Sequence, residues 1–131
     1  MLKEDRDEYL SVFLMDTKEY LAKMSEGMYI LEENQEDKEV INNIFRAVHS
    51  IKGSAGFFEF KRLNDIAHVY ETLLGKVREG ELKIDSKIFD NLFSAVNVIE
   101  KIVDNIEKKG EEPSGKEFDE VVGMDEETFY K

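Results

Sequence analysis

The sequence predicts an all-α protein, an antiparallel four-helix bundle of up-down topology with a short fifth helix at its C-terminal end. Apolar residues recur at steps of three and four through four long segments, which is the period of a helix with one buried face. The chain of 131 residues contains a single Pro, so little interrupts long helices. No segment shows the strict alternation of apolar and polar residues that marks a strand. Four amphipathic helices joined by short loops bury their apolar faces against one another as a bundle.

The first two helices are separated by a polar break at residues 34–37. We expect the first helix to run from Glu4 to about Glu33, with an apolar stripe made of Tyr9, Val12, Phe13, Tyr20, Met24, Met28 and Leu31. The second helix carries a stripe made of Val40, Ile41, Ile44, Phe45, Val48, Ile51 and Ala55.

The last two helices of the bundle have clear end signals. The third has the stripe Leu63, Ile66, Ala67, Tyr70, Leu73, Leu74 and Val77, and Gly80 closes it. Asp85 is a good N-cap for the fourth helix, and Ile84 before it can pack on Phe89. The fourth helix is expected to bury Phe89, Leu92, Phe93, Val96, Ile99, Val103 and Ile106.

The composition changes after residue 107. We expect a bundle over residues 1–107, and over residues 108–131 a linker, a short helix and an acidic tail. Lys108 to Ser114 is a linker by composition, because it contains both Gly and Pro. The short helix would pack on the bundle through Phe118, Val121, Val122 and Met124, and the end from Asp125 to Lys131 is expected to be loose.

Charge and composition exclude several classes of function. Hydrophobic residues make up 41% and charged residues 37%, which suits a single globular domain with a charged surface. The net charge of −12 argues against a nucleic-acid partner and against docking on anionic lipid. No apolar run approaches the roughly 20 residues of a membrane span, and the first residues lack a signal-peptide stretch, so we expect no membrane insertion and a cytoplasmic location. The absence of Cys excludes disulfides and thiol catalysis.

His49 is one of two histidines and the first candidate for chemistry. On a helical wheel it lies about 100° from the centre of the apolar stripe, so its ring should face water. Gly53 and Gly56 follow on the same flank, although each Gly inside a helix costs about 0.5–1 kcal/mol relative to Ala. A partner that brings its backbone close to the imidazole would explain this loss. The alternative is that these glycines allow close helix packing or end the helix, and it applies more to Gly56 than to Gly53.

A second cluster lies on the third helix, where His68 and Glu71 share one flank. Because a short turn around residues 59–62 makes the second and third helices antiparallel neighbours, we expect His49 to face this pair. A carboxylate bonded to one ring nitrogen fixes the tautomer and leaves the other nitrogen nucleophilic, so Glu71 is the candidate orienting group. Lys52, three residues after His49, can offset negative charge on the ring. The alternatives are solvated surface residues, or a metal site made by His49, His68 and Glu71, which the neighbouring Lys52 disfavours.

Two separated motifs resemble the phosphotransfer domains of the CheA type. The first is His49-Ser50-Ile51-Lys52-Gly53-Ser54-Ala55-Gly56, preceded by Phe45-Arg46-Ala47-Val48. The second is Ala67-His68-x-x-Glu71-x-Leu73-Leu74, followed by Lys76-Val77-Arg78-Glu79-Gly80. The resemblance covers residues 5 to 106 and departs at Glu59-Phe60, where the family often has Gly-Phe. The turn there is therefore expected to be built differently.

The resemblance implies a function in two-component chemotaxis signalling. His49 would be phosphorylated at Nε2, with Glu71 orienting it, Lys52 and His68 supporting it, and Gly53 and Gly56 on the docking surface. The partners implied are a histidine kinase catalytic domain that supplies ATP and Mg²⁺, and a response-regulator receiver domain whose Asp takes the phosphoryl group. The chain itself has no Gly-rich phosphate loop and no Asp/Asn metal cluster, so we expect it to bind no cofactor and to have no kinase activity alone.

Two other functions stay open at this point. A stand-alone phosphorelay module would also carry His49, Lys52 and Gly53, although the His68–Glu71 pair favours the CheA type. A purely structural helical adaptor would carry His49 and Gly53 only incidentally.

Overall fold

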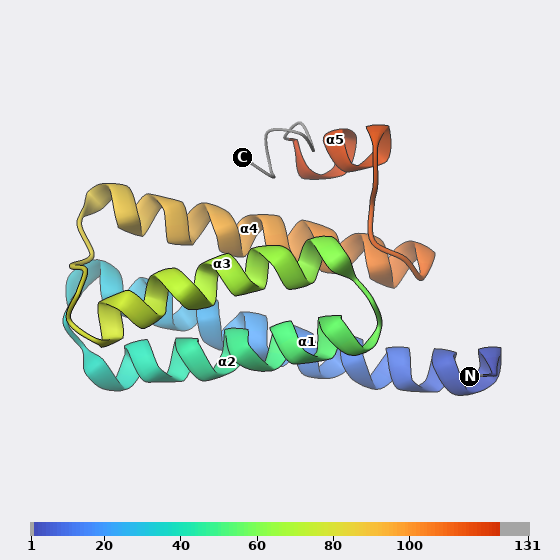
Figure 1. Ribbon diagram of the computed structural model, residues 1–131, viewed down its shortest axis with the longest axis horizontal. Coiled ribbons are helices and arrows are strands. Elements are labelled where there is room, and N and C mark those ends of the chain that lie inside the picture. The colour runs from blue at the N-terminus through green and yellow to red at the C-terminus, as the bar shows by residue number, and fades with distance from the viewer. Residues whose placement is uncertain (1, 124–131) are drawn as a thin grey trace.

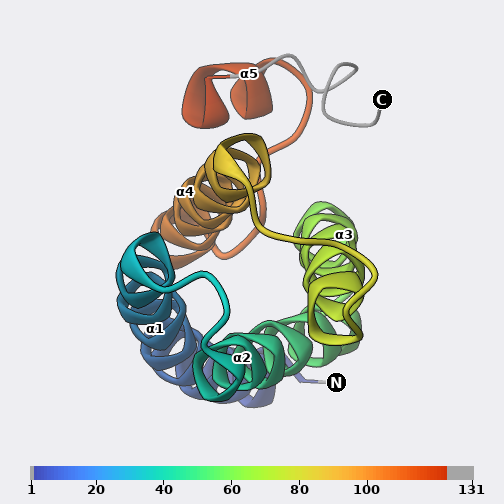
Figure 2. The same cartoon turned by 90° about the vertical axis from the view of Figure 1, so that its left-hand side faces the viewer.

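The computed structural model describes residues 2–123, and this part of the chain contains five helices and no strand (Figure 1). They are α1 (Lys3–Glu33), α2 (Lys38–Phe57), α3 (Lys61–Arg78), α4 (Ser86–Lys109) and α5 (Lys116–Val122). Helix α1 contacts α2 and α4, and α3 contacts the same two helices, so the first four close a ring around one core. Figure 2 shows this ring end-on, with α5 lying outside it against α4. The predicted all-α bundle with a short fifth helix is confirmed.

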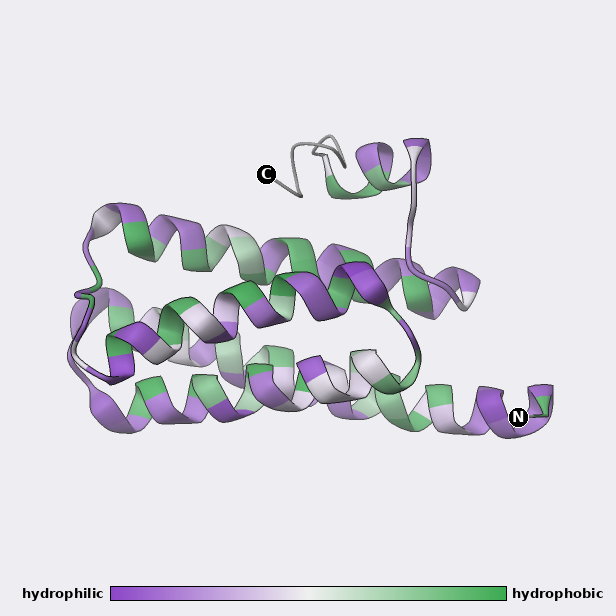
Figure 3. Ribbon diagram, viewed as in Figure 1, coloured by the Kyte–Doolittle hydropathy of each residue, from purple (hydrophilic) through white to green (hydrophobic). Residues whose placement is uncertain are grey.

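Apolar residues of all five helices form one buried core. Figure 3 shows hydrophobic and hydrophilic segments alternating along the helices. The largest fully buried side chains come from all five helices and include Met24, Ile44, Leu63, Leu74, Ile99 and Phe118.

Three residues expected in the core are exposed instead. Tyr9 and Val12 are 54% and 48% exposed, while Leu10 is buried in their place, so the buried face of α1 begins one position away from the predicted stripe. Tyr9 lies instead edge-on to the ring of Phe57, with centroids 6.5 Å apart. Phe93 is 40% exposed and stacks on Phe89 at the edge of the core, one turn away on α4.

Helices α1 and α2 approach each other closely at Gly27. A Cβ atom at this position would lie 2.6 Å from Cγ1 of Ile44, a contact that side chains do not tolerate. Gly27 is buried, and its lack of a side chain lets Ile44 of α2 approach α1 closely here. This role of Gly27 was not predicted from the sequence.

Asp side chains cap the starts of α2 and α4, and a Gly turn follows the end of α3. The backbone amide of Val40 donates to Asp37 at 3.2 Å, and that of Ile88 donates to Asp85 at 2.8 Å. Gly80 has φ +80°, which a Gly adopts freely and which places the amide of Glu81 2.9 Å from the carbonyl oxygen of Lys76. The predicted roles of Asp85 and Gly80 are confirmed.

The segment between α4 and α5 is tied to the start of α3. The carboxylate of Glu112 accepts hydrogen bonds from the backbone amides of Arg62 at 3.0 Å and Leu63 at 3.1 Å. Both amides belong to the first turn of α3, so Glu112 acts as a cap supplied from a distant part of the chain. Pro113, next to it, is buried. The division of the chain at residue 107 stays a prediction, and α4 continues past it to Lys109.

Helix α5 packs on the bundle through Phe118 and Val122, which are 0% and 4% exposed. Lys101 of α4 donates to the carbonyl oxygen of Val122 at 3.2 Å. The expectations for Met124 and for the end from Asp125 to Lys131 lie outside the described residues. Among residues 2–123, no helix is both long enough and apolar enough to cross a membrane.

Candidate functional site

The pairing of α2 with α3 positions the candidate site. The two helices are joined by a tight turn in which the amide of Phe60 donates to the carbonyl oxygen of Ala55 at 2.9 Å. Further along the pair, the side-chain amide of Asn64 donates to the carbonyl oxygen of Lys52 at 2.9 Å. The turn itself contains Glu59 with φ +59°, a left-handed conformation that is costly for any residue with a Cβ atom. The turn thus adopts a conformation that Gly would adopt more easily, although the residue there is Glu.

His49 meets Glu71 across the seam between these two helices. Nδ1 of His49 is within hydrogen-bonding distance of Oε2 of Glu71. The His49 side chain is 63% exposed, whereas that of Glu71 is only 13% exposed. Because an ionised carboxylate only accepts hydrogen bonds, the shared proton belongs on Nδ1. In the neutral ring, Nε2 then keeps a free lone pair, and it belongs to a largely exposed side chain.

Lys52 holds the other oxygen of the same carboxylate. Its Nζ donates to Oε1 of Glu71 at 2.7 Å, and its side chain is 26% exposed. Burial raises the pKa of Glu71, but the hydrogen bonds from Lys52 and His49 outweigh it, so the net effect is a pKa below the usual value. Glu71 is therefore ionised at neutral pH and accepts from both neighbours.

His68 lies one turn before Glu71 on α3 and is exposed. Within residues 2–123, no hydrogen bond or ion pair to His68 is found. The structure thus brings His49, Lys52 and Glu71 together and leaves His68 beside them. The supporting role of His68 stays a prediction.

Gly53 and Gly56 both lie exposed on α2. A Cβ atom at Gly53 would meet nothing within 4 Å, so helix packing does not require Gly there. At Gly56 a Cβ atom would lie 3.5 Å from Nδ2 of Asn64, an ordinary contact. Their place on a docking surface stays a prediction.

Phe45 and Arg78 lie near the site, although the sequence placed them only in an apolar stripe and in the two motifs and gave them no role there. The ring of Phe45 is parallel to that of His49 within 5°, with centroids 6.4 Å apart. The guanidinium carbon of Arg78 lies 4.0 Å from the centroid of the Phe45 ring. Phe45 is four residues before His49, so the helical spacing was a usable signal for the first contact. The contact of Arg78 with Phe45 joins two helices, so the local sequence pattern does not indicate it.

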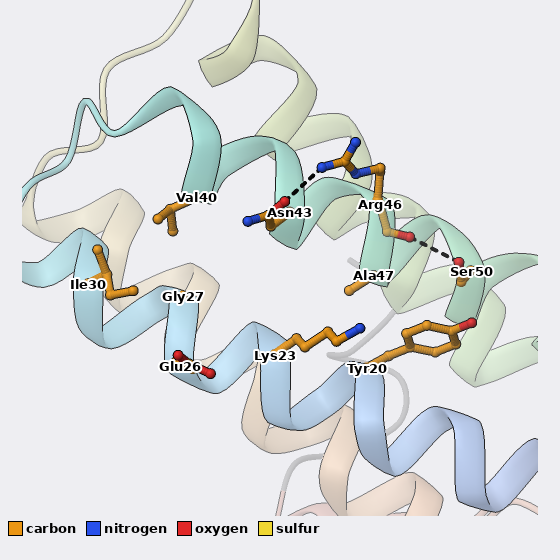
Figure 4. A pocket seen from close by; sticks show the side chains of 10 residues that line it. All are labelled: Tyr20, Lys23, Glu26, Gly27, Ile30, Val40, Asn43, Arg46, Ala47 and Ser50. Atoms are coloured by element: carbon orange, nitrogen blue, oxygen red, sulfur yellow. Dashed lines mark hydrogen bonds between the residues drawn. The ribbon is translucent and has the colours of Figure 1, made fainter.

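A groove of about 460 Å³ runs between α1 and α2 (Figure 4). Tyr20 and Lys23 line it from α1, and Arg46 and Ser50 line it from α2. Arg46 donates to Oδ1 of Asn43 at 2.7 Å on its rim. Neither the His49 nor the Glu71 side chain lines this groove. The groove and the candidate site are therefore separate features.

The sequence also raised a metal site made by His49, His68 and Glu71. In the part of the chain that the structure describes, no three His, Asp or Glu side chains are grouped so that they could hold a metal ion. Lys52 occupies Oε1 of Glu71, and its positive charge would repel a cation there.

Comparison with known proteins gives a consistent result. A model of the Hpt domain family matches residues 8–109. The chemotaxis protein CheA of Bacillus subtilis is 32% identical over 102 residues, which are 78% of this chain and 15% of that protein. The chain thus spans about a sixth of the length of the curated relatives it matches.

Solved structures show the same likeness. The CheA phosphotransferase domain from Thermotoga maritima is 43% identical, with a TM-score of 0.71, and the match covers 76% of this chain and 94% of that one. The phosphorylated P1 domain of CheA3 from R. sphaeroides, solved in complex with CheY6, has a TM-score of 0.78 at 20% identity, covering 95% of this chain and 97% of that one. The second likeness shows the fold alone.

Proposed function

The chain belongs to the Hpt domain family, and on that premise we propose that His49 accepts a phosphoryl group from ATP and passes it to an Asp of a response regulator. The ATP is held by the catalytic domain of a histidine kinase. The single observation that carries this proposal is the His49–Glu71 pair, in which Nδ1 is held by a carboxylate and Nε2 is left free on an exposed ring.

The first transfer needs no proton to leave the attacking atom. The lone pair on Nε2 forms a bond to the γ-phosphorus of ATP, and the bond from that phosphorus to the bridging oxygen breaks, releasing ADP. The ring becomes positively charged, because Nδ1 already carries a proton. The carboxylate of Glu71 beside Nδ1 stabilises this charge as it develops.

The second transfer reverses the change at the ring. A carboxylate oxygen of the receiver Asp forms a bond to phosphorus, the bond from Nε2 to phosphorus breaks, and His49 returns to its neutral form. Positioning and charge neutralisation are most of what phosphoryl transfer requires of a protein. Lys52 supplies positive charge one turn from the imidazole of His49. His68 on α3 supports His49. ATP and Mg²⁺ bind on the partner domains.

The relatives favour a CheA-type kinase as the donor over the stand-alone relay that the sequence left open. Gly53 and Gly56, exposed beside His49, supply a surface on which the kinase and receiver domains dock. We place the reaction in the cytoplasm because it draws its phosphoryl group from ATP.

The test is labelling with γ-³²P-ATP and a CheA-type kinase catalytic domain. The wild-type chain should take up label that is labile in acid and stable in base, as a phosphoramidate is. His49→Gln should fold with the same helix content and take up none, while His68→Gln, the matched control, should still be labelled on His49. Persistent labelling of His49→Gln would overturn the assignment.

A further inference from the structure

The hydrogen bond to Glu71 does not by itself fix the orientation of the His49 imidazole. A single contact at Nδ1 settles which nitrogen carries the proton, but it leaves the ring plane free to tilt about that contact. The His49 side chain is 63% exposed, so few other atoms restrain it. A transfer between two proteins depends on the direction in which Nε2 points as well as on its lone pair.

Phe45 supplies a second restraint, an aromatic ring parallel to the imidazole. It lies one turn before His49 on α2, and the two rings are parallel within 5° at a centroid distance of 6.4 Å. Aromatic rings attract each other in offset-stacked geometry over such distances. A flat neighbour parallel to the imidazole favours this orientation of the ring, because tilting would lose the offset-stacked arrangement.

Phe45 is itself held from α3. The guanidinium carbon of Arg78 is 4.0 Å from the centroid of the Phe45 ring, well within the range of a cation–π contact. Gly75 lies opposite on α3, where a Cβ atom would already touch Cε2 of Phe45 at 3.5 Å. The ring of Phe45 is therefore confined between α2 and α3, next to His49.

We propose that Phe45, held in place by Arg78, is a positioning residue that sets the plane of the His49 imidazole. This inference rests on the proposed function, because it assigns Phe45 to the reaction at Nε2. Arg78 acts through Phe45. The guanidinium group of Arg78 also forms an ion pair with the carboxylate of Glu79, with 3.5 Å between Nη2 and Oε1.

The experiment compares Phe45→Leu, which keeps the apolar bulk and removes the ring, with Phe45→Tyr, which keeps the ring. Phe93→Leu is the matched control, since it removes an equivalent stack on Phe89 within α4.

Arg78→Gln and the control Lys76→Gln remove one charge each from the last turn of α3. Each variant is measured by ¹⁵N NMR of the His49 ring, by thermal melting and by phosphorylation with the kinase domain at varied concentrations of this chain.

Phe45→Leu should lower kcat about three- to tenfold, the factor that corresponds to loss of one aromatic contact, with KM unchanged. Its His49 ring resonances should shift, and Phe45→Tyr should restore both. Arg78→Gln should show a smaller effect of the same kind, and both controls should behave as wild type.

A Phe45→Leu variant with wild-type kcat and wild-type ring resonances would overturn the inference. An increase in KM at constant kcat would also overturn it, since Phe45 would then be a docking contact. A wild-type chain that takes up no label would instead overturn the proposed function, and the ring resonances would still decide whether Phe45 orients His49.

Discussion

Lys52 and His49, one turn apart on α2, contact the two oxygens of a single carboxylate, that of Glu71. Lys52 keeps this carboxylate ionised, and the ionised carboxylate keeps the proton of His49 on Nδ1. Lys52 thus influences the reactivity of Nε2 through Glu71. Lys52 also attracts a phosphoryl group directly.

Glu71→Ala should therefore change the tautomer of His49 without unfolding the bundle. The wild-type ring should carry its proton on Nδ1, whereas the variant should show a mixture of the two tautomers, because nothing then selects Nδ1. Phosphorylation should slow, because only part of the population then has a free lone pair on Nε2. Side-chain ¹⁵N shifts of His49 report the tautomer directly, and Asp65→Ala, which removes another carboxylate from α3, is the control. An identical tautomer in wild type and Glu71→Ala would show that Glu71 does not orient the ring.

The lowered pKa of Glu71 predicts a pH dependence of stability. A carboxyl group whose pKa is lower in the folded state stabilises the fold at pH values above its unfolded pKa, about 4.5 for Glu. That contribution is lost as the pH falls through the lower, folded-state pKa. The free energies of unfolding in urea of wild type and Glu71→Gln should therefore differ most above about pH 5 and converge as the pH falls below about 4 toward the folded-state pKa. A difference that stays constant down to pH 3 would contradict this origin of the stabilisation.

The central part of the site could be predicted from the sequence. Helical spacing places His49 and Lys52 on one flank and His68 and Glu71 on another, and a short turn leaves few ways to pair the two helices. These constraints place His49 opposite the His68–Glu71 pair, and the structure shows that the contact is made with Glu71.

Other features could not be predicted, for identifiable physical reasons. Helical steps back from Phe13 reach Tyr9 as well as Leu10, so two apolar stripes fit the sequence. The buried stripe runs through Leu10 and includes the polar residue Thr17, which makes this stripe harder to recognise. The contact of Arg78 with Phe45 depends on the reach of two long side chains from different helices. The turn imposes the left-handed backbone conformation at Glu59, which Glu rarely adopts, so the residue type does not indicate it.

Glu59→Gly should stabilise the protein. The left-handed conformation costs a residue with a Cβ atom roughly 1–2 kcal/mol, and part of this gain is offset by the greater freedom of Gly in the unfolded chain. A net increase of about 1 kcal/mol in the free energy of unfolding is expected from urea titration. The control Glu36→Gly removes the same charge from a loop position without positive φ and should leave stability unchanged or lower it. If Glu59→Gly is no more stable than wild type, the turn is not strained.

Gly53→Leu should separate docking from folding. No atom lies within 4 Å of a Cβ atom at this position, and Leu forms helix better than Gly by up to about 1 kcal/mol, so the variant should melt as high as wild type or higher. Phosphorylation by the kinase domain and transfer to a receiver should both fall sharply, because the added side chain blocks close approach beside His49. Labelling of His49 by phosphoramidate, a small donor that needs no docking surface, should be spared.

Ser94→Leu, which adds bulk to an exposed position of α4, is the control for Gly53→Leu and should leave all three reactions unchanged. A Gly53→Leu variant that melts lower than wild type would favour a packing role for this glycine. A stable variant that exchanges phosphoryl groups with its partners at the wild-type rate would remove Gly53 from the docking surface.

The most direct measurement for the central claim is the position of the phosphorus–nitrogen bond in the phosphorylated chain. Labelling the histidines with ¹⁵N and recording ³¹P–¹⁵N couplings assigns the phosphoryl group to one nitrogen of one ring. Because Glu71 holds Nδ1 of His49, we expect a coupling to Nε2 of His49 and none to His68. A phosphoryl group on Nδ1 of His49, or on either nitrogen of His68, would contradict it.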